Sequence, residues 1–291
     1  MKKGLIYFHQ GWTDIVICMG LINYYDSLYD EITVLIRSDA KDIIDFYVKP
    51  LDSVKVIYLT TDNGRFYGGF TSTDSSEVIY EPNQIAPTND VNTFVDYSVS
   101  VGAGGTLKVP PTFELMCHGE HDRLRKDKYA GYWYRRNQRG TKHFSEAFYT
   151  YYDIDFNVRV KDFSIVRDMD EEQSVYDSFI KEHGTNYAIY HDDQTNHQSG
   201  VHHVSTKLNF TRTDGITYVN INKRSKNFFD HIKILESAKE IHLVDSVWAA
   251  ICYQLDAKYG LFKNKSVKIY CERGHYNLFT YPVKLKNWEL I

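Results

Sequence analysis

Short apolar runs alternate with helix-like segments near the start of the chain, and this alternation restricts the possible fold more than any other feature. The apolar runs are rich in leucine, isoleucine, valine and tyrosine, and the segments between them place apolar residues on one helical face. An order of strand, helix and strand predicts a parallel sheet with right-handed crossover connections. The predicted strands cover residues 5–8, 32–36 and 54–59. The first predicted helix covers residues 15–25. The second begins after a cap at Ser38 or Asp39 and ends at Val48, before Pro50.

The same pattern returns in the second half of the chain. Strands are expected over residues 187–190, 215–220, 240–244 and 267–270, and helices over 171–183, 228–238 and 246–259. Between the two blocks, residues 60–115 are rich in glycine, threonine and proline and are expected to form long loops. The sequence therefore predicts an α/β fold of two Rossmann-like domains that face each other across a cleft, with residues 1–160 in the first domain and 161–291 in the second.

The composition is typical of a globular protein. The 291 residues are 43% hydrophobic and 25% charged, which suffices for two medium-sized domains. A formal net charge of −4 gives no basic footprint of the kind that binds nucleic acid. No apolar run is long enough for a signal peptide or a membrane span, and the four cysteines lack the spacing of a zinc or disulfide pattern. We therefore expect a cytoplasmic protein that has no integral membrane segment and does not bind nucleic acid.

The turn after the first predicted strand concentrates residues that suit a binding site. It consists of His9, Gln10, Gly11, Trp12, Thr13 and Asp14. A glycine permits a tight turn or a close approach of the backbone, and ligands bind outside the carboxyl ends of parallel strands. Asp14 has two interpretations, because it could cap the helix that follows or take a proton from a bound hydroxyl group.

A second polar segment, residues 117–129, brings His118, Glu120, His121 and Asp122 together before a basic stretch. The spacing lacks the two histidines four residues apart that helical zinc motifs contain. A polar pocket for a sugar or phosphate is therefore favoured over a metal site. A charged, solvated loop is the alternative, above all for the basic residues.

Polar residues also follow the strands of the second block. His191, Asp192 and Asp193 come directly after the strand at 187–190. Paired aspartates could hold a cation, but adjacent residues of an extended chain point to opposite sides. We therefore expect one of the two carboxylates to bond the loop.

Two further turns of the second block suit a phosphate group. Asp245 and Ser246 lie between a strand and a helix, where a hydroxyl, backbone N–H groups and the positive end of the helix dipole form an anion site. The alternative there is a simple helix cap. Lys223 and Arg224 follow another strand and suit a diphosphate, although such residues are also common on protein surfaces.

The order of these motifs resembles that of small glycosyltransferases of the GT-B fold, of the heptosyltransferase-like and fucosyltransferase-like kind. Such proteins begin with a strand and a turn of the form His-x-Gly-x-Gly-Asp, which His9 to Asp14 match except that Thr13 replaces the second glycine. The resemblance covers most of the chain outside residues 60–115. Its other matching stretches are residues 118–129, 143–155, 187–193 and 238–255.

The resemblance implies roles for several residues. Asp14 corresponds to the acid that deprotonates the acceptor hydroxyl in inverting relatives, and Asp245 and Ser246 correspond to the motif that binds the donor phosphate. Ala250 stands where heptosyltransferases have a histidine, so the resemblance does not identify the donor. No divalent metal and no cofactor is expected, because protein groups would meet the charge of the diphosphate.

We therefore predict a glycosyltransferase that moves a sugar from a nucleotide sugar to a glycan or another hydroxyl acceptor. One alternative is an α/β protein that binds a nucleotide or phosphosugar without transferring it, and another is a metal-dependent hydrolase built on His118, His121, Asp192 and Asp193. The predicted site residues are Asp14 as the catalytic base, His191, Lys223, Arg224, Asp245 and Ser246 for the donor phosphate, and His9, Gly11, Trp12, His118 and Asp122 for the substrate.

Overall fold

The computed structural model confirms an α/β protein with parallel sheets. Its chain packs into two compact units, the first of Met1–Gly11, Leu21–Lys142 and Glu146–Phe156 and the second of Trp12–Gly20, His143–Ser145 and Asn157–Ile291. Among the residues that the structure describes, no helix is long and apolar enough to cross a membrane. The structure describes residues 2–8, 12–37, 40–62, 65–67, 79–82, 97–100, 105–109, 113–118, 146, 149, 153–192, 208, 210–221, 227–244, 246–270 and 285–291. At residues 7 and 37, and at the described residues between 59 and 118, only the backbone is described.

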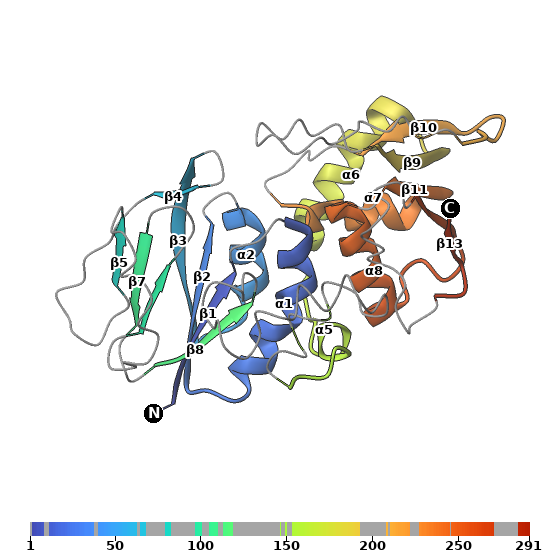
Figure 1. Ribbon diagram of the computed structural model, residues 1–291. Coiled ribbons are helices and arrows are strands. Elements are labelled where there is room, and N and C mark those ends of the chain that lie inside the picture. Colours follow the sequence, from blue (N-terminus) through green and yellow to red (C-terminus); the bar gives the residue numbers. More distant parts are fainter. Residues whose placement is uncertain are drawn as a thin grey trace. The chain divides into compact units, whose positions relative to one another are not determined.

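The first unit contains a five-stranded sheet with the strand order β4-β3-β2-β1-β8 (Figure 1). β1 (Lys3–Phe8), β2 (Glu31–Arg37), β3 (Val54–Asp62) and β8 (Phe113–His118) are parallel, and β4 (Arg65–Tyr67) is antiparallel to β3. α1 (Trp12–Asp26) connects β1 to β2, and α2 (Lys41–Val48) connects β2 to β3. Because β2 and β8 flank β1 on its two sides, the strand order reverses beside β1.

The region 60–115 differs from the expected long loops. It includes β5 (Ile79–Pro82), β6 (Tyr97–Ser100) and β7 (Gly105–Val109), which form an antiparallel sheet in the order β5-β7-β6. Pro82 and Gly105 are paired at the end of this ladder. The proline and the glycine therefore mark where strands end, which is compatible with the positions that these residues take in sheets.

The second unit contains a five-stranded sheet in the order β10-β9-β11-β12-β13, in which every neighbouring pair is parallel (Figure 1). Counted along the chain, this is the 2-1-3-4-5 order of doubly wound folds, whose ligands bind where the strand order reverses. That reversal lies between β9 and β11. The strands are β9 (Tyr187–His191), β10 (Thr217–Asn220), β11 (Glu240–Val244), β12 (Ser266–Tyr270) and β13 (Trp288–Leu290).

The helices of the second unit connect these strands and cover the apolar residues of the sheet. Ile189 and Ile241 on one face of the sheet, and Ala188 and His242 on the other, are buried, as expected for a parallel sheet covered on both faces. The helical elements are α5 (Val158–Lys161), α6 (Met169–His183), the 3-10 helix η4 (Phe229–His231), α7 (Ile232–Ser237) and α8 (Val247–Tyr259).

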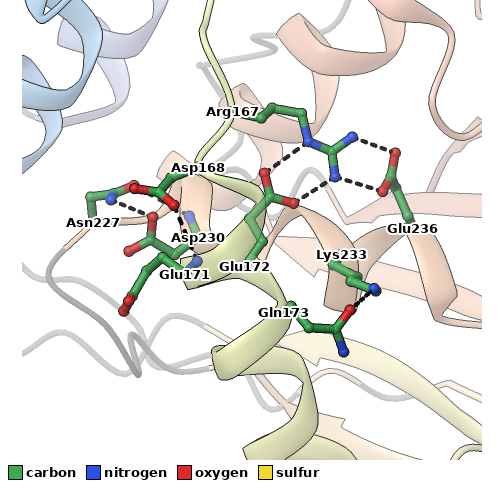
Figure 2. A network of polar contacts seen from close by, with 9 residues as sticks. All are labelled: Arg167, Asp168, Glu171, Glu172, Gln173, Asn227, Asp230, Lys233 and Glu236. Carbon is green, nitrogen blue, oxygen red and sulfur yellow. Dashed lines mark hydrogen bonds and ion pairs between the residues drawn. The ribbon is translucent and has the colours of Figure 1, made fainter.

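Arg167, in the segment that precedes α6, forms ion pairs with one glutamate on α6 and one on α7. Figure 2 shows the Arg167 guanidinium between the carboxylates of Glu172 on α6 and Glu236 on α7. It donates two hydrogen bonds to Glu172, at 2.8 and 2.5 Å, and two to Glu236, at 3.0 and 2.8 Å. The side chain of Glu172 is only 1% exposed, and Arg167 is its charged partner. Asp168 then caps α6 by accepting a hydrogen bond from the Glu171 amide at 3.1 Å.

Gly20 of α1 packs closely against the backbone of α5, so alanine at this position is expected to destabilise the protein. A Cβ at this position would lie 2.7 Å from the Val158 carbonyl oxygen and 2.9 Å from the Arg159 carbonyl oxygen. Alanine in place of glycine within a helix ordinarily stabilises by roughly 1 kcal/mol. Here the contacts are backbone atoms, so we expect Gly20→Ala to lower the free energy of unfolding by about 1–3 kcal/mol in urea denaturation.

The control for Gly20→Ala is Ser178→Ala, which adds alanine at an exposed position of α6. Its free energy of unfolding should stay within about 0.5 kcal/mol of the original protein. If the Gly20→Ala variant is as stable as the original protein, α5 must move away from the added methyl group without a loss of stability.

Candidate functional site

The strand reversal of the second sheet brings two of the predicted site residues into contact. β9 ends at His191, and Ser246 immediately precedes α8, which follows β11. The Oγ of Ser246 lies 3.2 Å from the Nδ1 of His191, within hydrogen-bonding distance. Both were predicted for the donor phosphate, and both lie at the carboxyl edge of the sheet, where doubly wound folds bind ligands.

The start of α8 leaves backbone donors without a side-chain cap. Ser246 is the N-cap residue in an extended conformation, and its carbonyl accepts the Ala250 amide at 3.0 Å. Its hydroxyl makes no capping hydrogen bond and instead contacts His191. The N–H groups of the first turn of a helix have no partners within the helix and carry its positive dipole end. This edge can therefore bind an anion.

Asp192 is bound to the neighbouring strand. The Nδ2 of Asn220, the last residue of β10, donates to its Oδ1 at 2.8 Å. The expectation that one of the two carboxylates after β9 bonds the loop stays a prediction, because this partner belongs to a strand and Asp193 lies outside the described residues. The Oδ1 of Asn220 is buried and accepts no hydrogen bond in the described part of the chain. A ligand hydroxyl could supply the missing donor at this edge.

Asp14 lies in the first turn of α1, which begins at Trp12 rather than at the predicted Ile15. The pKa of Asp14, whose side chain is only partly exposed, is raised by desolvation from its ordinary value of 3.8 to about 7. Burial also raises the pKa of the Cys18 thiol, one turn further along α1, and the Asp14 carboxylate raises it further. The positive end of the helix would lower the pKa of Asp14, so desolvation dominates. A carboxyl group that titrates near neutrality is suited to proton transfer.

Three aromatic rings link the first turns of helical elements in the second unit. Trp12, at the start of α1, contacts Phe228 edge to face with ring centroids 5.2 Å apart. Phe228 immediately precedes η4 and contacts Trp248 of α8 in the same way at 4.8 Å. Trp12 was predicted to bind substrate, and the structure shows that its ring packs against protein. Phe228 therefore links the Trp12 ring, at the start of α1, to the Trp248 ring in the first turn of α8.

The remaining predicted residues are only partly described. His118 ends β8, where its backbone is in register with Phe8 at the end of β1. It therefore lies at the strand reversal of the first sheet. The predicted residues His9, Gly11, His121, Asp122, Asp193, Lys223, Arg224 and Asp245 lie outside the described residues.

Asn220, Phe228 and Trp248 were not among the site residues predicted from the sequence. Asn220 could have been found, because it is the last residue of a predicted strand and the same rule selected His191. The two aromatic residues carry no such signal. Among the described residues, no group of three or more histidine, cysteine or acidic side chains could hold a metal ion.

Comparison with known proteins gives no assignment. No family model, no curated protein and no solved structure matches the chain.

Proposed function

We propose that the protein is a glycosyltransferase of the GT-B fold that transfers a sugar from a nucleotide sugar to a glycan or another hydroxyl acceptor. The contact between His191 and Ser246 at the strand reversal, beside the start of α8, is the observation that carries this proposal. It combines a hydroxyl and an imidazole with the first turn of a helix, whose N–H groups have no partners within the helix, at the edge where doubly wound folds bind phosphate groups. The two-domain GT-B arrangement is part of the proposal.

The donor diphosphate would bind at the start of α8. Its oxygens accept hydrogen bonds from the N–H groups of the first turn and from the Ser246 hydroxyl, and His191 adds a further donor when protonated. Lys223, Arg224 and Asp245 complete the proposed donor site on the basis of their sequence positions. The same groups stabilise the charge that develops on the leaving diphosphate, so the proposal includes no divalent metal.

Asp14 would act as the base. In its ionised form it takes the proton of the acceptor hydroxyl while that oxygen bonds to the sugar C1 and the bond between C1 and the diphosphate oxygen breaks. A pKa of about 7 makes this carboxylate a stronger base than an exposed aspartate and still leaves much of it ionised at neutral pH. His9, Gly11, Trp12, His118 and Asp122 belong to the proposed acceptor side.

A protein that binds a nucleotide or phosphosugar without transferring it is the second candidate. The contact between Ser246 and His191 and the start of α8 suit any phosphate ligand, whether or not it reacts. The elevated pKa of Asp14 favours the transferase, since binding alone does not need a carboxyl group that titrates near neutrality. Tight binding of a nucleotide sugar without turnover on a broad acceptor panel would favour the second candidate.

The test begins with a thermal-shift screen of UDP, GDP, CDP, ADP, dTDP, CMP and their common sugar conjugates. We expect one nucleotide to raise the melting temperature in a saturable manner, because a ligand of the folded state stabilises by linkage. For that nucleotide, Ser246→Ala should weaken binding about tenfold, the effect of one hydrogen bond to a charged group. Titration calorimetry measures this difference.

The control variant is again Ser178→Ala, which removes an exposed hydroxyl in the same unit. It should bind the nucleotide as the original protein does. A saturable nucleotide whose affinity is equal in the original protein and in Ser246→Ala would place the phosphate elsewhere and remove the main support for the proposed donor site.

A further inference from the structure

A basic hollow lies at the amino edge of the second sheet, whereas His191 and Ser246 lie at its carboxyl edge. It forms where β12 and β13 begin, between the loops that precede these strands, and has a volume of about 460 Å³. The hollow is open to solvent, and its volume lies within the range of about 300–1,000 Å³ that is typical of small-molecule sites. The residues used below are Lys263, Lys265, Ser266, Lys286, Asn287 and Trp288, all of which line the hollow.

The walls of the hollow are fixed by hydrogen bonds between its two loops. The Nδ2 of Asn287 donates to the carbonyl oxygens of Phe262, at 2.6 Å, and Lys265, at 3.1 Å. The indole Nε1 of Trp288 donates to the Oδ2 of the buried Asp256 at 2.8 Å. These hydrogen bonds hold the two loops together before a ligand binds, which lowers the cost of ordering them.

Three lysines bring positive charge to this hollow. Within the described part of the chain, the ammonium groups of Lys263, Lys265 and Lys286 form no ion pair with any carboxylate. Glu289 is the acidic residue of the lining, and its nearest cationic partner is Lys268, at 4.0 Å on β12. The hollow is therefore basic in a chain whose formal net charge is −4.

A fourth lysine increases the local repulsion. The Nζ of Lys265 donates to the Ala238 carbonyl at 2.8 Å, beside Lys239. Burial lowers the pKa of Lys265 and the charge of Lys239 lowers it further, while Glu236 acts in the opposite direction. Like charges within a Debye length destabilise each other, and a bound anion removes that cost.

We propose that this hollow is a second anion site, which binds a phosphate-bearing ligand. Phosphate oxygens accept hydrogen bonds from the ammonium groups of Lys263 and Lys286 and from the Ser266 hydroxyl, and the Trp288 ring forms an apolar wall. The phosphate belongs either to a free metabolite or to a lipid head group, because the recognising chemistry is the same. The site does not depend on the proposed transferase activity.

The experiment titrates inorganic pyrophosphate into ¹⁵N-labelled protein at constant ionic strength and follows the tryptophan indole N–H signals. We expect the Trp288 signal to shift with saturation, because Trp288 lines the hollow. The double variant Lys263→Ala/Lys286→Ala should bind at least about tenfold more weakly at this signal, as expected when two charged hydrogen-bond donors are lost. Lys265 is left in place because it also binds the Ala238 carbonyl.

The matched control is Lys161→Ala/Lys181→Ala, which removes two exposed lysines of the second unit and changes the net charge equally. It should retain the affinity of the original protein. The Trp248 signal, beside Ser246, reports binding at the candidate donor site, so the two sites are distinguished in one titration.

A second arm uses vesicles of a neutral phospholipid with and without an anionic one. Sedimentation only with anionic vesicles, lost in the Lys263→Ala/Lys286→Ala variant, would assign the phosphate to a lipid head group. Saturable pyrophosphate binding without sedimentation would assign it to a free metabolite. A Trp288 signal that does not saturate, or that shifts equally in the double variant, together with no selective sedimentation, would overturn the proposal.

Discussion

Replacing Asp14 with asparagine is expected to lower turnover by a factor of about 10²–10⁴, the usual contribution of a general base, and to leave donor affinity nearly unchanged. Asparagine keeps the shape of the side chain but cannot take a proton. The rate of the original protein should rise with pH through about 7, because burial raises the pKa of Asp14 to that value and the ionised form is the base. Initial rates measured across pH, with donor binding measured separately, check both expectations.

Asp42→Asn provides the matched control for Asp14→Asn. Asp42 also lies in the first turn of a helix, α2, but it is exposed. If Asp14 were only a helix cap, the two substitutions would have similar and small effects on turnover. Equal rates for the original protein and Asp14→Asn would exclude the assignment of the base.

Folding stability distinguishes loss of the base from damage to the fold. The pKa of Asp14 is raised from 3.8 to about 7 in the folded protein, so between these values the folded state holds a proton that the unfolded state has released. The free energy of unfolding therefore falls as pH rises through this window, by a few kcal/mol at most. Asp14→Asn should lack this slope and should be more stable than the original protein above pH of about 7. An inactive variant of equal or greater stability then identifies a functional loss.

The elements of both sheets could be predicted where the apolar pattern was regular. The strands expected over 187–190 and 240–244 are β9 and β11, with a difference of one residue at His191. The strands within residues 60–115 were not predicted, because a high content of glycine and proline is typical of loops and of strand ends alike. The apolar pattern therefore predicted β9 and β11, whose residues are largely buried.

The site could be predicted only in part, because its contacts depend on strand order. The sequence places His191 and Ser246 at the same edge of a sheet, but their contact requires β9 and β11 to be neighbours. That arrangement is a property of the whole sheet. The elevated pKa of Asp14 has a similar origin, since its burial depends on the tertiary packing around α1.

Arg167→Ala is expected to lower the free energy of unfolding of the second unit by about 3–5 kcal/mol, the cost of leaving a buried charge without its partner. The substitution removes four hydrogen bonds and leaves the carboxylate of Glu172, 1% exposed, beside the like charge of Glu236 (Figure 2). The hydrogen bonds to Glu172 and then to Glu236 hold the pKa of Arg167 above its ordinary value, although burial opposes them. Arg167→Lys should restore only part of the stability, because an ammonium group cannot bind two carboxylates in the planar, bidentate manner of a guanidinium.

Tryptophan fluorescence in a urea titration measures this effect, since three of the four tryptophans, Trp12, Trp248 and Trp288, belong to the second unit. The control in the same unit is Lys268→Ala, which removes a partly exposed ion pair with Glu289 and should cost less than about 1 kcal/mol.

The double variant Arg167→Ala/Glu172→Gln shows whether Arg167 stabilises the second unit by pairing charges or by packing. If the loss in Arg167→Ala comes from the unpaired carboxylate of Glu172, a neutral amide at that position should recover a large part of it. If the double variant is instead as unstable as the sum of the two single variants, the arginine stabilises the unit mainly by packing its long side chain between α6 and α7. The network in Figure 2 would then stabilise through contact area, and charge pairing would contribute little.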